Sequence, residues 1–173
     1  AGSDVAACKT SAVRDGDEYV INGSKMWITG AGYADFFFVL AKTDVDAGYK
    51  GMSGFIVEST AEGFSLGKKE INMGQRCSDT RSIQFDDVRI PADQLVGGSE
   101  SGGWMNAMKA FDMSRPNIAA HATGLARAAY EHALQYSGER STFGKPLYKH
   151  QAIQFMLADM KTKIEASRML TWK

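Results

Sequence analysis

The fold class is decided by a stretch near the start of the chain, which reads Glu18-Tyr19-Val20-Ile21-Asn22-Gly23-Ser24-Lys25-Met26-Trp27-Ile28-Thr29. The aromatic and β-branched residues in its two halves are typical of short strands. Asn-Gly between them is the strongest two-residue hairpin signal, because both central residues of a type I′ turn need positive φ. The stretch therefore predicts a β-hairpin in which residues 25–29 pair back on residues 18–21.

The same pattern continues on both sides of this stretch, as far as residue 98. Runs of strand-forming residues alternate with turns that contain glycine or proline. We expect a turn at 14–17 and further strands at 5–13, 35–42, 54–58, 64–70, 81–85 and 88–89. Short strands at this spacing predict an antiparallel barrel or sandwich. About 98 residues are enough to hold a core of their own.

Beyond residue 98 the spacing of the apolar residues becomes helical, with steps of three or four. We expect one helix over 103–136, loosened locally at Pro116, which lacks an N–H and clashes with the preceding turn. A loop should cover 138–149. A second helix should begin at His150, carry its apolar face on Ile153, Leu157, Met160 and Ile164, and run past Lys173, since no capping signal ends it there.

The sequence therefore predicts a multi-domain α+β protein. Residues 1–98 form a β domain, and residues 99–173 contribute two long helices of an incomplete helical domain. Two amphipathic helices cannot bury their apolar stripes against each other alone, so further helices are needed from the same chain or from other subunits.

The composition disfavours several functions. Twenty Lys and Arg balance twenty Asp and Glu, so bulk charge offers no attraction to nucleic acid. No apolar run approaches the roughly 20 residues of a membrane helix. Cys8 and Cys77 read as free thiols, and His121, His132 and His150 lack the spacing of a metal site, so we expect no bound metal.

Two segments carry residues suited to ligand binding. Residues 25–30 offer an aromatic wall and a hydroxyl to a flat conjugated ligand, although a tryptophan on a strand is more often a core residue. In the segment 111–116, Asp112 and Arg115 lie three residues apart on one helix face. They are either a surface ion pair or a polar clamp on a charged group such as a nucleotide phosphate.

A third segment, residues 139–146 with His150-Gln151 behind it, gathers two cations, two hydroxyls and an aromatic ring. It suits a pyrophosphate, with Gly144 permitting close approach of the backbone, or it is only a solvated polar loop. Neither GxGxxG nor GxxxxGK[ST] occurs, so the usual dinucleotide and P-loop motifs are not present.

These segments resemble the acyl-CoA dehydrogenase family in order and spacing. The resemblance is carried by Ala1-Gly2-Ser3-Asp4, by residues 22–29, by Asn72-Met73-Gly74-Gln75-Arg76-Cys77-Ser78-Asp79-Thr80-Arg81, and by residues 111–116, 139–146 and 150–155. It spans all 173 residues. The short- and medium-chain members look most similar, and residues 72–81 look most like the medium-chain enzyme. The resemblance implies a middle β-barrel domain and the first two helices of a C-terminal four-helix bundle.

The cofactor implied by this resemblance is FAD. Trp27, Ile28 and Thr29 would border the flavin ring, and Ser3 would lie where the flavin and the CoA moiety come close. The pyrophosphate and adenosine end of FAD would be held by Arg140, Thr142, Phe143, His150 and Gln151. That FAD would belong to a neighbouring subunit, because the family usually forms a homo-oligomeric dimer of dimers.

The resemblance also implies the reaction. A straight-chain acyl-CoA would be oxidised to trans-2-enoyl-CoA in fatty acid β-oxidation, with electrons passed to electron-transfer flavoprotein. Asp112, Met113, Ser114 and Arg115 would line the CoA path. The protein would reside in the mitochondrial matrix of a eukaryote or the cytoplasm of a bacterium.

A glutamate is the family's catalytic base. In branched-chain and long-chain members it lies where this chain has Ser114, and in short- and medium-chain members it lies in a later segment. Serine cannot do that work, so we expect no catalytic residue in this chain and a base beyond Lys173. Asp112, Glu131 and Glu139 are interpreted as binding or surface residues.

Other readings stay open on the same scaffold. An acyl-CoA oxidase or nitroalkane oxidase would depend on solvent access to reduced flavin, which sequence does not reveal. A DNA-binding flavoprotein would need a basic stripe, against which the balanced charges argue. A non-catalytic structural fragment, without turnover, is the remaining alternative.

Overall fold

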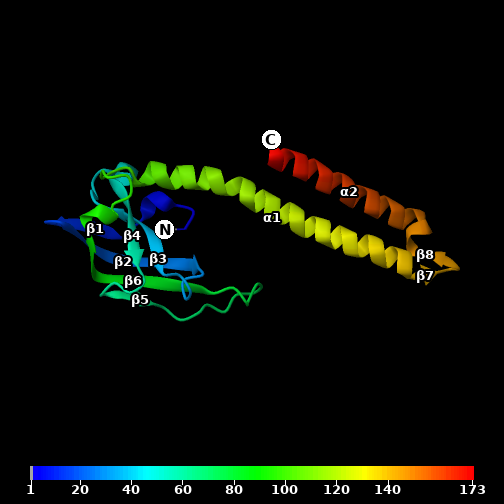
Figure 1. Cartoon of the computed structure of the whole chain (residues 1–173), viewed down its shortest axis with the longest axis horizontal. Helices are drawn as coiled ribbons and strands as arrows, with labels where there is room; N and C mark the ends of the chain where they lie inside the picture. Colours follow the sequence, from blue (N-terminus) through cyan, green and yellow to red (C-terminus); the bar gives the residue numbers. More distant parts are fainter. Residues whose placement is uncertain (1) are drawn as a thin grey trace. The chain divides into compact units, whose positions relative to one another are not determined.

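The structure is a computed structural model that describes residues 2–173 and divides into two compact units, the first ending at Lys109 and the second spanning Ala110–Lys173. The first unit is built on one six-stranded sheet with the order β4-β3-β1-β2-β6-β5 (Figure 1). Its strands are β1 (Ser11–Asp15), β2 (Glu18–Thr29), β3 (Phe36–Lys42), β4 (Met52–Glu58), β5 (Phe64–Leu66) and β6 (Thr80–Pro91). The expected α+β class is confirmed.

The sheet is mixed rather than wholly antiparallel. β1 and β3 are parallel neighbours, while the other four pairings are antiparallel. The parallel pair arises because the chain leaves β2, crosses to the opposite side of β1 and reverses direction. The expected strand over 5–13 begins only at Ser11, since Val5–Ala7 form a 3₁₀ turn instead. The strand expected over 64–70 is shorter and ends at Leu66.

The hairpin predicted at Asn22-Gly23 is wrong. β2 runs unbroken through these residues, and the tight turn lies at residues 16–17, where Asp15 pairs with Glu18. At Asn22 the register shifts: Ile21 pairs with Val88 and Gly23 with Phe85, so Asn22 faces both residues 86 and 87 of β6. This two-against-one arrangement is a β-bulge. It also joins the strands expected at 81–85 and 88–89 into the single strand β6.

Gly23 is required at this bulge for two reasons. Its φ of 133° lies outside the range that side chains favour, and a Cβ there would lie 2.9 Å from Cα of Thr10. Asn-Gly therefore serves positive φ and close backbone approach inside a strand, instead of the turn that the same pair usually marks.

The core of the first unit follows the strand period of two. On β3, Phe37 and Val39 are buried while Phe36 and Phe38 are exposed. On β6 the buried apolar positions change from odd-numbered to even-numbered residues across the bulge, so both halves of the strand face the same core. Burial of a large apolar side chain contributes about 1.5–3 kcal/mol, which fixes this register. The core cluster comprises Ala12, Tyr19, Ile21, Ala31, Phe37, Val39, Ala41, Phe55, Val57, Ile83, Phe85, Val88 and Ile90.

The helix α1 (Gly103–Glu139) begins in the first unit. Its Trp104 packs against Tyr49 of the 3₁₀ turn η2 (Gly48–Gly51), with ring centroids 5.3 Å apart. Ser101 donates its N–H to Oγ of Ser53 at 2.9 Å, which ties the chain just before the helix to β4. The domain boundary expected near residue 98 stays a prediction.

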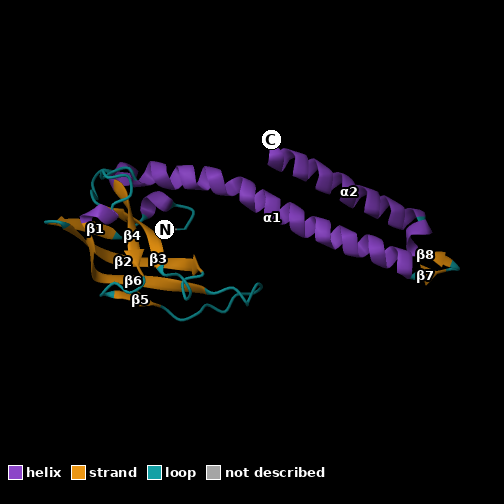
Figure 2. Ribbon diagram, viewed as in Figure 1, coloured by secondary structure: helices purple, strands orange, loops and turns teal. Residues whose placement is uncertain are grey.

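The second unit contains the rest of α1 and the antiparallel helix α2 (Gln151–Trp172), joined by a small hairpin and the 3₁₀ turn η4 (Leu147–Lys149) (Figure 2). Both expected helices are confirmed. α1 continues through Pro116 as one unbroken α-helix. The expected loop over 138–149 instead holds the strands β7 (Ser141–Thr142) and β8 (Lys145–Pro146). Within residues 2–173, no helix is apolar over a length that would cross a bilayer.

The predicted apolar face of α2 is its least exposed face. Ile164 is buried, and Ile153, Leu157 and Met160 are partly buried. Many other apolar side chains of the second unit are exposed, among them Phe155, Met156, Met169, Leu170 and Trp172. These two helices therefore leave apolar surface open, as expected for an incomplete bundle.

Candidate functional site

The segment that follows the first bulge of β2 contains a second bulge. Lys25 pairs with Ile83 and Ile28 pairs with Arg81, so Met26 and Trp27 together face the single residue Ser82. Trp27 has φ 65°, in the left-handed region that bulky residues rarely adopt. Such strain costs about 1–3 kcal/mol and is concentrated at functional sites.

The bulge changes what the tryptophan does. Trp27 is 62% exposed, so it is not the core residue that a tryptophan on a strand usually is. Ile28 packs on the core cluster and anchors the segment. Thr29 is exposed, which leaves its hydroxyl accessible to a ligand. An exposed indole, an anchor and an accessible hydroxyl are what a flat conjugated ligand needs from one strand end.

The turn after β2 is held by Asp79, which directly precedes β6. The Asp79 carbonyl accepts the N–H of Gly30 at 2.6 Å. Its carboxylate accepts the N–H of Gly32 at 2.8 Å and the Nε–H of Arg81 at 2.9 Å. Arg81 in turn donates from a terminal nitrogen to the carbonyl of Gly67 at 3.2 Å.

Asp79 is ionised in this environment. Its side chain is buried, and burial raises the pKa of the carboxyl. The hydrogen bonds from Gly32 and Arg81, together with the charges of Arg81 and Lys69, outweigh burial and bring the pKa below its ordinary value. Sequence reasoning did not single out this residue. It lies in the family-like segment 72–81, where the signal for this role was an acid two residues before an arginine.

The start of the same segment is held separately. Nζ of Lys25 donates to the carbonyl of Leu40 at 2.6 Å and lies 3.0 Å from Sγ of Cys8. Cys8 is buried and free, and Cys77 is exposed and free.

Ser3, expected near the flavin and the CoA moiety, is exposed in the segment that precedes the 3₁₀ turn η1 (Val5–Ala7).

In the second unit, Asp112 and Arg115 form an ion pair on the surface of α1, and their side chains are 69% and 70% exposed. Ser114 donates its hydroxyl to the carbonyl of Phe111 at 3.0 Å, and Met113 is 78% exposed. The helix-surface pair is therefore present. Because both of its members remain exposed, the pair is still accessible to a charged ligand.

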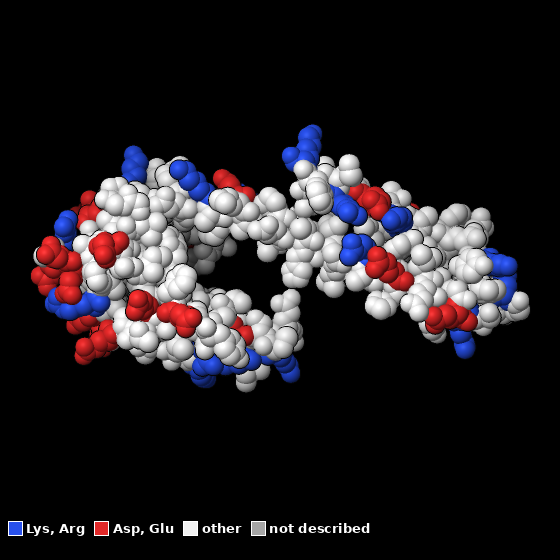
Figure 3. Space-filling view, viewed as in Figure 1, with Lys and Arg blue, Asp and Glu red and all other residues white. Residues whose placement is uncertain are grey.

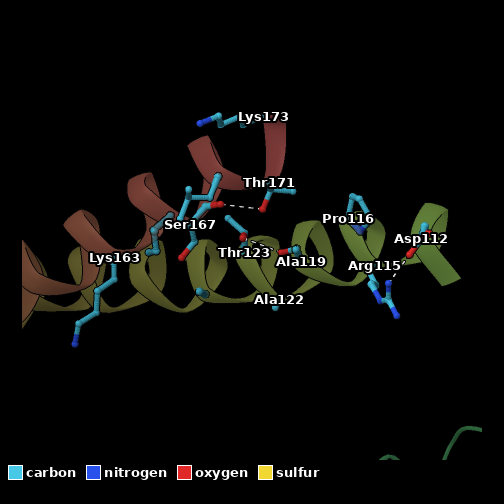
Figure 4. A pocket seen from close by; sticks show the side chains of 13 residues that line it. Asp112, Arg115, Pro116, Ala119, Ala122, Thr123, Lys163, Ser167, Thr171 and Lys173 are labelled. Atoms are coloured by element: carbon cyan, nitrogen blue, oxygen red, sulfur yellow. Dashed lines mark hydrogen bonds and ion pairs between the residues drawn. The ribbon is translucent and has the colours of Figure 1, made fainter. Parts of the chain in front are cut away.

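Asp112 and Arg115 also lie at one end of a groove of about 690 Å³ between α1 and α2 (Figure 4). Small residues of α1 form its floor, including Ala119 and Ala122, and Ser167 and Thr171 border it from α2. The groove is a surface that the two helices leave uncovered rather than an enclosed cavity.

The third predicted segment is brought together by the β7–β8 hairpin. Its two-residue turn is Phe143-Gly144, with φ 51° and 74°. Phe143 is 97% exposed, and its ring meets that of His150 edge-on at 6.3 Å. Nε2 of His150 lies 3.4 Å from Oγ1 of Thr142 and 3.2 Å from its carbonyl oxygen. A bulky aromatic held at positive φ and presented to solvent is a second strained, exposed feature.

Arg140 and Gln151 flank this hairpin. The N–H of Arg140 donates to Tyr136 at 3.0 Å and its carbonyl accepts from Leu147 at 2.9 Å, so its backbone is fixed while its side chain is exposed. Gln151 is the first residue of α2 and is also exposed. A guanidinium beside the N-terminus of a long helix suits a phosphate group.

On the face shown in Figure 3, lysine and arginine are interspersed with aspartate and glutamate in both units. In the part of the chain that the structure describes, no three His, Cys, Asp or Glu side chains gather in a way that would hold a metal ion.

The donor set fits the two ends of FAD. Trp27 and Thr29 offer a wall and a hydroxyl for the isoalloxazine ring, and Arg140 offers a cation for the pyrophosphate. The structure brings together residues 27–29 in the first unit, and separately gathers Arg140, Thr142, Phe143, His150 and Gln151 in the second. Their roles toward FAD stay predictions.

Comparison with known proteins agrees with this geometry. Residues 1–88 match the family described as acyl-CoA dehydrogenase, middle domain, and residues 101–173 match acyl-CoA dehydrogenase, C-terminal domain. The chain belongs to the acyl-CoA dehydrogenase family, whose members are oxidoreductases.

Three similar proteins illustrate the range of the family. The chain is 49% identical to a probable medium-chain specific acyl-CoA dehydrogenase 2, mitochondrial, of Caenorhabditis briggsae, over 100% of this chain and 43% of that protein. It is also 49% identical to a cyclohexane-1-carbonyl-CoA dehydrogenase of Geobacter metallireducens, over 100% of this chain and 45% of that protein. The butyryl-CoA dehydrogenase structure of Megasphaera elsdenii superimposes with a TM-score of 0.95 at 44% identity, over 99% of this chain and 45% of that one. The chain thus spans less than half the length of these relatives.

Proposed function

We propose that the complete protein is an FAD-dependent dehydrogenase that converts an acyl-CoA to its trans-2-enoyl-CoA. The observation that carries this proposal is the bulge at Met26-Trp27, which holds an exposed indole at φ 65° two residues before an exposed threonine. Strained residues of this kind are concentrated at functional sites, and the flavin is the ligand that the family resemblance implies for Trp27. When bound, FAD supplies the acceptor for the hydride that leaves the β carbon.

The residues of this chain bind and orient. Ile28 is anchored in the core, so Trp27 and Thr29 keep a fixed spacing along one strand end. Fixed placement of reacting groups is what lowers the barrier of a bimolecular step, because the entropy of orientation is lost on binding rather than in the reaction. Asp112 and Arg115 offer paired charges for the polar part of CoA, and Ser3 adds a hydroxyl where the flavin and the CoA moiety come close.

We place the catalytic base outside residues 1–173. The position on α1 where some relatives carry a glutamate is Ser114, whose hydroxyl is committed to the Phe111 carbonyl. A neutral serine cannot remove an α proton as a carboxylate does. The test combines two substitutions: the natural base is removed from the complete protein, and Ser114 is then replaced with glutamate. Regained activity would show that position 114 has room for a catalytic carboxylate and that Ser114 does not supply the base.

The substrate class follows only in part from similarity. Two relatives of equal identity are named for a medium-chain and an alicyclic acyl-CoA. We propose a straight-chain acyl-CoA of short or medium length, because residues 72–81 look most like the medium-chain enzyme and one relative of 49% identity is named for a medium-chain acyl-CoA. Comparison of kcat/KM for butyryl-, octanoyl- and cyclohexane-1-carbonyl-CoA decides among them.

We further propose that electron-transfer flavoprotein accepts the electrons, and that the protein acts in fatty acid β-oxidation, in the mitochondrial matrix of a eukaryote or the bacterial cytoplasm. The test is turnover of butyryl-CoA with and without electron-transfer flavoprotein, under air and under nitrogen. A dehydrogenase forms more than one equivalent of enoyl-CoA per flavin only with the protein acceptor. Oxygen uptake with stoichiometric peroxide would instead identify an acyl-CoA oxidase.

A homo-oligomer is part of the proposal. The exposed apolar side chains of α2 require a partner surface to cover them. Arg140 and Phe143 also form an exposed patch, which the other residues of 110–173 leave open to a ligand. A dimer of dimers would supply a neighbour's FAD to this patch. Light scattering of the complete protein gives the oligomeric state, and Arg140→Ala should weaken FAD binding without changing that state.

A further inference from the structure

We propose that Asp79 is a positioning residue for the flavin-facing segment, residues 27–29, and that it acts by fixing the turn that follows them. The inference rests on the proposed function, because it assigns Asp79 a role toward the same segment. Asp79 itself is buried and does not touch a ligand surface: its side chain is 1% exposed.

The segment needs such a device because its backbone is strained. Trp27 is left-handed at a bulge, where one ladder connection is missing. An unfavourable conformation of this kind persists only when the surrounding structure over-determines it. Upstream, Nζ of Lys25 holds the Leu40 carbonyl at 2.6 Å. Downstream, the only cross-strand partners before the turn are Thr80 for Thr29 and Arg81 for Ile28.

Asp79 supplies the downstream constraint at two levels. Its main-chain carbonyl accepts from Gly30 at 2.6 Å, directly after the segment. Its carboxylate accepts from Gly32 at 2.8 Å, two residues further round the turn. One residue therefore fixes two amides of the turn and, through adjacent Thr80, the end of β2.

Arg81 makes this arrangement rigid. Its Nε lies 2.9 and 3.1 Å from the two carboxylate oxygens of Asp79, and it also holds the Gly67 carbonyl. A charged hydrogen bond to a buried carboxylate is stronger than a neutral one. The pair thus links the turn, the start of β6 and the segment after β5 into one network.

Gly32 shows how closely the turn is fitted to this pair. A Cβ at Gly32 would lie 3.0 Å from both Nε of Arg81 and Oδ2 of Asp79. The close approach leaves room for glycine alone unless the ion pair shifts. Gly32→Ala therefore disturbs the pair while all charges remain, and provides a second variant if Asp79→Asn folds poorly.

A buried ion pair is often only structural, so the test needs readouts that separate positioning from folding. In the complete protein, Asp79→Asn and Gly32→Ala are compared with the wild type by amide hydrogen exchange, by the visible absorbance and circular dichroism of the flavin, and by kcat and KM. Asp15→Asn is the matched control, because Asp15 forms an exposed ion pair with Arg89 at 3.0 Å in the same sheet.

Positioning predicts a defined pattern. Both variants should speed exchange of the amides of residues 30–34 by at least about tenfold, shift the flavin spectrum and lower kcat by about 10- to 100-fold while KM changes little. Asp15→Asn should leave all three unchanged. The proposal is overturned if exchange in the turn and the flavin spectrum match the wild type, or if Asp15→Asn has the same effects.

Failure of the proposed function gives a different result. In that case the wild-type protein itself carries no flavin and oxidises no acyl-CoA. Hydrogen exchange of residues 30–34 still reports whether Asp79 orders the turn, so the two failures are distinguishable. If the turn then exchanges equally fast in wild type and Asp79→Asn, the positioning claim fails as well.

Discussion

Asn22 and Asp87 exchange two hydrogen bonds across the first bulge of the sheet. Nδ2 of Asn22 donates to Oδ1 of Asp87 at 2.8 Å, and the Asp87 N–H donates to Oδ1 of Asn22 at 2.9 Å. Asp87 has φ 49°, so this reciprocal pair stabilises an unfavourable backbone conformation on β6. The two residues stand 65 positions apart in the sequence.

Asn22→Ala removes both hydrogen bonds. We expect the free energy of unfolding to fall by about 1–2 kcal/mol, because two partly solvated bonds are lost and the left-handed Asp87 is left without its side-chain partner. Chemical denaturation of the complete protein measures the change. Gln84→Ala, at an exposed position on the same strand β6, should change stability by less than about 0.5 kcal/mol. Equal effects of the two substitutions would contradict this role.

Gly23→Ala tests the backbone of the same bulge. The substitution should lower the free energy of unfolding by about 1–3 kcal/mol, since φ is 133° and the new Cβ would meet Thr10 at 2.9 Å. Gly74→Ala is the control, because no atom lies within 4 Å of a Cβ there. An unchanged free energy of unfolding in Gly23→Ala would mean that the strand is not bulged at this residue.

These two residues also show where sequence reasoning failed. Asn-Gly predicted a hairpin because the preference reports positive φ, and at this bulge Gly23 also has a positive φ. The choice between the two depends on residues 86–87, which are distant in sequence and become neighbours only in the sheet. In contrast, both long helices followed from local periodicity, and α2 begins at Gln151, directly after the predicted His150.

The candidate site was predictable to a similar degree. Trp27 and Thr29 were identified from residue type and from family resemblance, but the bulge that exposes Trp27 was not, since it arises from pairing with Ser82. Asp79 was part of the family-like segment 72–81 but was given no role, because its role depends on tertiary hydrogen bonds. Likewise Phe143 gave no turn signal, because an aromatic residue at positive φ runs against local preference.

Phe143→Asn separates stability from function at the second patch. Asn-Gly suits a type I′ turn better than Phe-Gly, so the hairpin should be unchanged or stabilised by up to about 1 kcal/mol. If Phe143 contacts the adenosine end of FAD, the same variant should bind FAD about 5- to 10-fold more weakly. Thermal unfolding of the apoprotein and titration with FAD give the two numbers. Loss of stability together with unchanged FAD affinity would mean that Phe143 stabilises the hairpin and does not bind FAD.

The pH dependence of stability reports on Asp79. Because its pKa lies below the ordinary value of 3.8 in the folded protein, ionised Asp79 favours folding above that value. The contribution is lost as the pH falls through the lower, folded-state pKa. Wild-type Tm should therefore drop more steeply below about pH 4 than the Tm of Asp79→Asn. Parallel profiles for the two proteins would show that Asp79 is not the group responsible.

We propose that residues 27–29 form the wall of a flavin site in an acyl-CoA dehydrogenase. The most direct measurement is the absorbance of the purified complete protein at about 450 nm, recorded under nitrogen before and after addition of butyryl-CoA and octanoyl-CoA. We expect a flavin band that bleaches with at least one acyl-CoA, and a weaker or shifted band in Trp27→Ala. A protein without this band, or a band that no acyl-CoA bleaches and Trp27→Ala leaves unchanged, would contradict it.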